Sequence, residues 1–189
     1  MPNGDAGNDN VKAYGVGDQL YGGSGSDDLL SVLATLARPG DEPFRGDTVG
    51  TSQALTGGSG EDSFILINFK TLIVKGDQDG TLSEEDIITG LFPVVTDYEE
   101  GEVTDIREAS LNEQTDDIVI SQPAPGRGNI RLHASTHAIV HGNLTEPGNF
   151  VVEDDGEDTI VLHSRTDWSD IPAEGVFVLK GYSGDIVFA

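Results

Sequence analysis

Three aspartates, Asp9, Asp18 and Asp27, are each separated by nine residues. Each is followed two positions later by an aliphatic residue, and glycines precede it. In lines of nine the segment reads GDAGNDNVK (4–12), AYGVGDQLY (13–21) and GGSGSDDLL (22–30). A period of this length is typical of a solenoid unit, in which a short turn is followed by a short strand whose aliphatic side chain points inward. The spacing therefore strongly restricts the folds open to the N-terminal part of the chain.

The turn half of each line has the composition of a calcium site. Glycines permit positive φ angles, so backbone carbonyls can converge, and the aspartate adds a carboxylate. Calcium takes six to eight oxygen ligands of these two kinds. If one coil contains two lines, turns 4–9 and 22–27 stack on each other, with Asp18 on the opposite side and lacking a clear partner. The candidate ligands are Gly4, Gly7, Asp9, Gly22, Gly25 and Asp27, with Asp18 in the weakest turn. A flexible linker rich in Gly and Asp is the competing interpretation, and the shared register of the three lines argues against it.

A second run, GGSGEDSFI (57–65), repeats the third line closely. It adds Gly57, Gly60 and Asp62 as candidate calcium ligands. Asp62 lies 35 residues after Asp27, one short of four repeats, so the insert 31–47 breaks the register. Both a small second roll and one irregular roll are compatible with this offset.

These runs resemble the nonapeptides of the RTX (repeats-in-toxin, hemolysin-type) family. The segment VTDYEEGEVTDI (95–106) is similar to sequences that follow such repeats in family members. The resemblance implies a parallel β-roll that folds on meeting extracellular calcium, in the C-terminal region of a bacterial protein exported by type I secretion. The ending DIVFA (185–189) is compatible with the C-terminal secretion signal of that route, and equally with a final strand.

Composition agrees with an acidic, extracellular calcium binder. The formal net charge is −24 and cysteine is absent, so calcium can take the role that disulfides have elsewhere. Such a charge disfavours nucleic acid and anionic membranes and attracts divalent cations. No apolar run approaches the roughly 20 residues of a membrane span. We expect a monomer.

The rest of the chain is patterned for strands. Short β-branched runs separated by Gly, Pro, Asn and Asp predict a sandwich-like or continued β-roll region. The overall prediction is an all-β fold, with a calcium-binding roll at 1–66 and a β-rich region at 67–189. Only 82–89 looks helical, with Thr81 and Glu84 placed as a capping box. Strands are predicted at 63–69, 71–74, 103–107, 117–121, 129–133, 138–141, 149–153, 159–163, 176–180 and 186–188.

Weaker candidate metal sites occur after residue 70. KGDQDGTLSEED (75–86) resembles an EF-hand loop and offers Asp77, Asp79 and Asp86, but Lys75 occupies the first ligand position. A polar turn is the alternative. Two acidic turns, 153–161 and 97–102, are interpreted as solvated in preference to weak calcium sites. His133, His137 and His141 are four apart, which on a strand separates neighbours by about 13 Å, too far for one metal ion.

Catalytic motifs are not evident, so we predict a non-enzymatic calcium-binding module. Two other functions stay open. One is a calcium-stabilised adhesin that binds a carbohydrate or a cell-surface or matrix ligand near Trp168 and Tyr182. The other is the tail of a secreted hydrolase whose catalytic domain lies outside this sequence.

Overall fold

The regular elements of the protein are all β-strands. The computed structural model describes residues 3–14, 17–32, 53–67, 73–76, 80–106, 113–124, 127–133, 135–146, 148–164 and 174–189. Within these residues no helix is present, and none could cross a membrane. The predicted all-β class is confirmed at this level.

One sheet of five strands is parallel throughout. Its order is β1 (Asn10–Ala13), β3 (Asp28–Val32), β5 (Ser63–Ile67), β9 (Val103–Ile106) and β17 (Val187–Phe188). Val11 pairs with Leu29, and Leu29 with Phe64. These registers correspond to steps of 29 − 11 = 18 and 64 − 29 = 35 residues, and the next pair, Phe64 with Thr104, steps by 104 − 64 = 40. The insert between the two glycine-rich blocks is therefore accommodated within a single continuous sheet.

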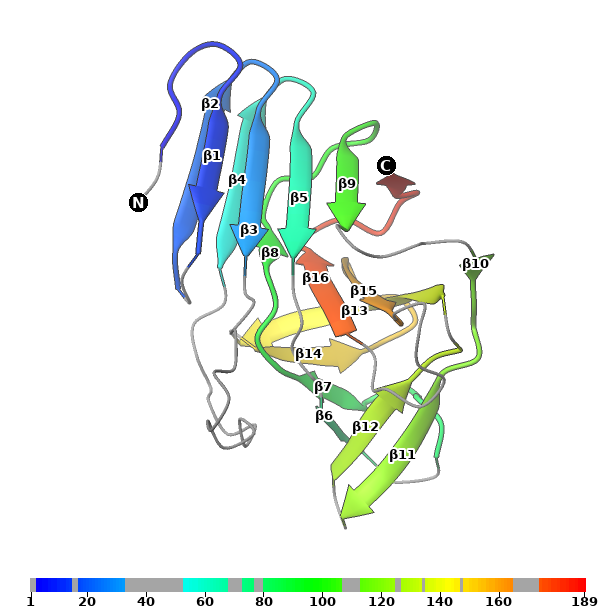
Figure 1. The fold of residues 1–189 in the computed structure, drawn as a ribbon. Coiled ribbons are helices and arrows are strands. Elements are labelled where there is room, and N and C mark those ends of the chain that lie inside the picture. The colour runs from blue at the N-terminus through cyan, green and yellow to red at the C-terminus, as the bar shows by residue number, and fades with distance from the viewer. Residues whose placement is uncertain are drawn as a thin grey trace.

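A second parallel set of strands lies behind the first (Figure 1). It contains β2 (Gln19–Ser24), β4 (Ala54–Ser59), β8 (Val94–Val95) and β16 (Glu174–Leu179). Leu20 pairs with Leu55 and Leu55 with Val95, so the steps of 35 and 40 residues recur on this side. Alternate residues of both sheets point inward and form a common core, which includes Leu20, Leu29, Leu55, Phe64, Val95 and Phe177. Stacking of these apolar residues is what the period in the sequence encodes.

Antiparallel strands continue the second sheet beyond β16. The order onward is β15 (Asp158–His163), β13 (Thr136–Glu146), β14 (Asn149–Val152), β7 (Ile87–Thr89), β6 (Ile73–Lys75), β12 (Arg127–Arg131) and β11 (Val119–Ala124). The short strand β10 (Glu113–Gln114) pairs with β13. A separate apolar core, built around Ile88, Ile130, Phe150 and Ile160, fills this part. Every strand predicted after Asp62 overlaps an observed one.

The predicted helix at 82–89 is wrong. Glu85 has a φ of 70°, which a right-handed helix does not accommodate, and residues Ile87–Thr89 form β7. The Asp86 carboxylate accepts a hydrogen bond from the Ser83 amide at 2.9 Å. This side chain stabilises a turn over 83–86 and competes with helix formation, which explains why the capping-box pattern of Thr81 and Glu84 was misleading.

Candidate metal centre

Four turns stack at one end of the parallel strands. They are residues 4–9, 22–27, 57–62 and 97–102, and each leads into a strand of the five-stranded sheet. We call them turns 1 to 4. They follow the same steps of 18, 35 and 40 residues as the strands, because each turn enters its strand at the same position. The predicted stacking of turn 1 on turn 2 is present, and turn 3 continues it.

Backbone hydrogen bonds hold turns 1 to 3 together. The Gly7 amide donates to the Ser24 carbonyl at 2.7 Å, and the Ser24 amide donates to the Asp5 carbonyl at 3.0 Å. The Gly25 amide donates to the Ser59 carbonyl at 2.8 Å. The turns thus lie as close as neighbouring strands in a sheet, so any group between them must be very small.

Glycine is required at this spacing. An added Cβ on Gly22 would overlap the Gly57 carbonyl oxygen, and one on Gly60 would overlap the Gly25 carbonyl. Gly25 and Gly60 also have φ angles of 132° and 138°, which side chains rarely adopt. The glycines of the motif therefore bring carbonyl oxygens of one turn against the backbone of the next.

An acidic side chain ends each turn, and together they form a carboxylate ladder: Asp9, Asp27, Asp62 and Glu102. The Asp9 amide donates to Asp27 Oδ1 at 2.8 Å, and the Asp27 amide donates to Asp62 Oδ1 at 2.8 Å. Three members of the ladder are buried, with 1% exposure for Asp27, 2% for Asp62 and 4% for Glu102. Carboxylates that are removed from water in this way need compensating charge or hydrogen bonds.

The second oxygen of two ladder members has no such compensation. Asp27 Oδ2 and Asp62 Oδ2 are buried and accept no hydrogen bond. Asp27 Oδ2 and the Gly57 carbonyl oxygen both occupy the space that a Cβ of Gly22 would fill, so a carboxylate oxygen and a carbonyl oxygen converge there. The arrangement repeats beside Gly4, where Asp9 Oδ2 and the Gly22 carbonyl oxygen meet, although Asp9 Oδ2 also accepts from the Asp5 amide at 3.1 Å.

Proton affinities reflect this crowding of negative charge. Burial raises the pKa of Asp62, and the charges of Asp27 and Asp97 add to the increase, against the lowering effect of the hydrogen bond from the Asp27 amide. Burial also raises the pKa of Glu102 to about 7, with the neighbouring acidic groups contributing in the same direction. A divalent cation would relieve the same repulsion without protonation.

The residues of turns 1 to 3 fit calcium. Each turn offers one carboxylate together with main-chain carbonyls, a mixture of hard oxygens that calcium accepts and softer metals do not favour. Among the residues that the structure describes, no three His, Cys, Asp or Glu side chains gather as a metal-holding group. Main-chain oxygens would therefore supply most of the coordination.

Turn 4 has the same place in the stack but different chemistry. Asp97 takes the position that Gly57 has in turn 3, and its carboxylate accepts hydrogen bonds from the Gly57 and Gly58 amides, both at 2.9 Å. Tyr98 is buried, and its hydroxyl donates to the Glu102 carbonyl at 2.6 Å. Sequence reasoning treated this turn as solvated and so missed Asp97 and Glu102. That interpretation is wrong for Glu102, and the signal lay in the steps 27 + 35 = 62 and 62 + 40 = 102, which need the strand registers.

The remaining predicted ligands lie apart from the ladder. Asp18 precedes β2 in the opposite sheet, and its carbonyl accepts from the Ala54 amide at 3.0 Å. Asp77 and Asp79 are outside the described residues. Asp86 is 3% exposed, and its Oδ2 accepts from the Ser83 amide and hydroxyl at 2.9 and 3.3 Å, which fits the polar-turn alternative.

The acidic turn before β15 also differs from its predicted solvated state. Asp154, Asp155 and Glu157 are exposed, but Asp158 is only 6% exposed. Its two oxygens accept hydrogen bonds from the Leu144 and Gly181 amides, both at 2.7 Å. This carboxylate links two segments of the protein and leaves no oxygen unsatisfied.

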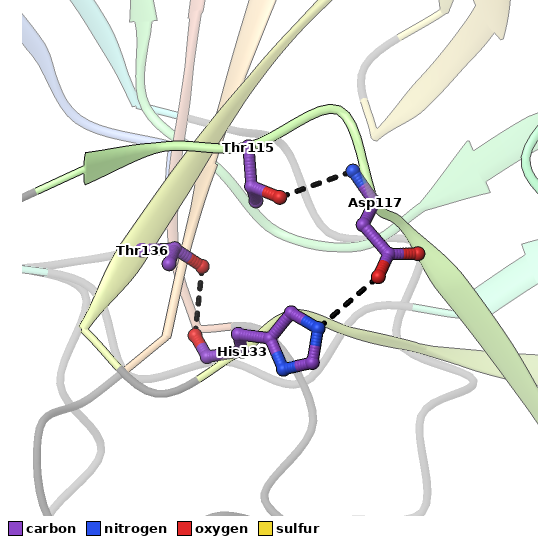
Figure 2. A network of polar contacts seen from close by, with 4 residues as sticks. All are labelled: Thr115, Asp117, His133 and Thr136. Carbon is purple, nitrogen blue, oxygen red and sulfur yellow. Dashed lines mark hydrogen bonds and ion pairs between the residues drawn. The ribbon is translucent and has the colours of Figure 1, made fainter.

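The three histidines of the four-residue series do not form a metal site among the described residues. His133 is exposed and contacts Asp117 at 3.1 Å, in the polar network of Figure 2. There the Thr136 hydroxyl donates to the His133 carbonyl at 2.7 Å, and the Asp117 amide donates to Thr115 Oγ1 at 3.1 Å. His137 is buried beside the Phe188 ring, with 5.1 Å between ring centroids, and burial lowers its pKa.

The aromatic pair expected near a ligand surface is only partly described. Tyr182 packs edge-on against Tyr98, with 4.7 Å between ring centroids, and its hydroxyl donates to the Asp185 carbonyl at 2.7 Å. Trp168 lies outside the described residues. Tyr182 thus has a packing role at the end of the stacked turns.

Comparison with known proteins adds no family assignment. No protein-family model and no curated protein matches this chain.

Proposed function

We propose that the chain is a calcium-binding module of the RTX type, in which turns 1 to 3 and the two parallel sheets form a β-roll that folds around calcium. The observation that carries the proposal is Asp27 Oδ2, a buried carboxylate oxygen without a hydrogen-bond donor, placed beside the Gly57 carbonyl in a space that only glycine leaves open. One ion would lie between turns 1 and 2 and another between turns 2 and 3.

Calcium would act here mainly by stabilising the fold. At ten times Kd, one site contributes about 1.4 kcal/mol. Extracellular calcium modules bind with Kd near 10⁻⁴ to 10⁻³ M, a range in which the ion is scarce inside cells and abundant outside. Two or more sites would supply a sizeable share of the ~5–15 kcal/mol that keeps a domain folded. This supports a non-enzymatic role in a secreted bacterial protein, exported before it folds.

Circular dichroism with calcium and with EGTA tests the coupling to folding. We expect the turns and their strands to lose β-structure in EGTA and to regain it on calcium addition. An unchanged spectrum would contradict the proposal. In titration calorimetry, Asp27→Ala should weaken binding far more than Asp18→Ala, because Asp27 lies within the ladder and Asp18 lies before the opposite sheet. Equal effects of the two substitutions would refute this assignment of the ligands.

A further inference from the structure

Asp62 and Glu102 form a carboxylate pair at the boundary between turn 3 and turn 4. Their carboxyl groups lie within hydrogen-bonding reach of each other, yet neither side chain carries a donor when both are ionised. Both are buried, at 2% and 4% exposure. Like charges in such contact repel strongly when water is absent.

The surroundings do not balance this negative charge. The charged groups that influence Asp62 and Glu102 are Asp27, Asp97 and Glu99, and all are acidic. Asp97 is already occupied by the Gly57 and Gly58 amides, and one oxygen of Glu102 accepts from the Glu99 amide at 2.7 Å. Asp62 Oδ2 receives nothing. A buried, unpartnered oxygen therefore remains within a pair of carboxylates.

We propose that a divalent cation of the calcium type binds between Asp62 and Glu102, outside the glycine motif. Asp62 Oδ2 and the second oxygen of Glu102 are its protein ligands, and water completes the coordination. The choice of ion rests on the proposed function, but the site itself rests on this pair. It differs from the sites between glycine turns because side-chain carboxylates replace the converging carbonyls.

An ion at this place would tie the stacked turns to the C-terminal strands. The Glu102 carbonyl accepts from the Tyr98 hydroxyl, and that hydroxyl in turn accepts from the Val187 amide of β17 at 3.3 Å. Tyr98 also packs on Tyr182, which precedes β17. Fixing Glu102 fixes these contacts, so the cation links calcium to the docking of the last strand.

Equilibrium dialysis of Glu102→Gln against calcium, with metal analysis, tests the site. We expect this variant to retain one calcium equivalent fewer per chain than the unsubstituted protein. Glu100→Gln is the matched control, because Glu100 is an exposed acid of the same turn and removes the same charge. Glu102→Gln and Glu100→Gln binding the same number of ions with equal affinity would overturn the inference. If Asp27→Asn still loses calcium in that case, the proposed function stands; if no protein retains calcium, the proposed function itself fails.

A stability measurement separates ion binding from a purely structural role. In EGTA, Glu102→Gln should be at least as stable to urea as the unsubstituted protein, because one buried charge is gone. In calcium it should gain less stability. Equal loss under both conditions would indicate a structural residue and overturn the site. Glu102→Asp covers failure of the glutamine variant to fold: it keeps the charge on a shorter side chain and should bind the full number of ions, one more weakly. An unchanged affinity in that variant would also contradict the proposal.

Discussion

The stacked turns and the antiparallel region use buried aspartates in opposite ways. Asp158, between β13 and β16, has both oxygens occupied by backbone amides of the protein itself. Asp27 and Asp62 in the stacked turns are buried to a similar degree, yet each has one oxygen occupied and one empty. The first arrangement is complete without an ion, and the second is not.

This difference explains how one short chain can contain a region that depends on calcium and a region that does not. The antiparallel part has its own apolar core around Ile88, Ile130 and Phe150, and its buried acids are hydrogen-bonded. The turns have little apolar content, and their acids repel one another. We therefore expect calcium to govern the stability of the stacked turns and to matter much less for the antiparallel strands.

The largest effect should come from closing the space between turns. Gly60→Ala places a Cβ on the Gly25 carbonyl, whereas Gly7→Ala, at the equivalent place in turn 1, meets nothing within 4 Å. Both residues have positive φ, at 138° and 122°, so both pay the conformational cost of ~1–2 kcal/mol. The overlap should add about 1–3 kcal/mol at Gly60 alone. Urea unfolding in excess calcium measures the difference, and equal losses would show that the turns are not stacked this closely.

A smaller effect is expected from removing one charge in each region. Asp158→Asn should cost ~1–3 kcal/mol both with and without calcium, because an acceptor for a backbone amide is lost in either condition. Asp27→Asn should cost stability only with calcium, and it should be neutral or stabilising in EGTA, where it removes repulsion. Thermal unfolding of both variants under both conditions gives the comparison. A calcium-dependent cost at Asp158 would remove the distinction between the two regions.

The sequence was sufficient for the features that repeat locally. Glycine positions, the aspartate that ends turns 1 to 3 and the inward aliphatic residues all follow from the nine-residue pattern. The strands after Asp62 followed from β-branched runs, because side-chain alternation leaves a visible signal. The false helix at 82–89 arose because Thr81 and Glu84 matched a capping box while Asp86 was the side chain that stabilised the turn.

The sequence was insufficient where the structure depends on register over long insertions. The steps of 35 and 40 residues cannot be read from a nine-residue period, so Glu102 could not be aligned with Asp62. Asp158 presents the converse problem. Its segment resembles a degraded repeat, but its role is set by the Leu144 and Gly181 amides, which approach from distant parts of the chain.

The smallest predicted effect concerns pH and lies at the junction of the two regions. His137 on β13 is buried between Phe188 and its cross-strand neighbour His163, and burial lowers its pKa from 6.5. The unfolded chain then binds a proton more readily than the folded protein, so stability is full above about pH 6.5 and falls as the pH drops below it. The slope from one such group is at most about 1.4 kcal/mol per pH unit. His137→Gln should flatten the decline between pH 7 and pH 5, whereas His133→Gln, at an exposed site, should not. Chemical unfolding of these proteins across that range measures the slopes. Equal slopes would show that the ladder carboxylates, and not the buried histidine, set the acid response.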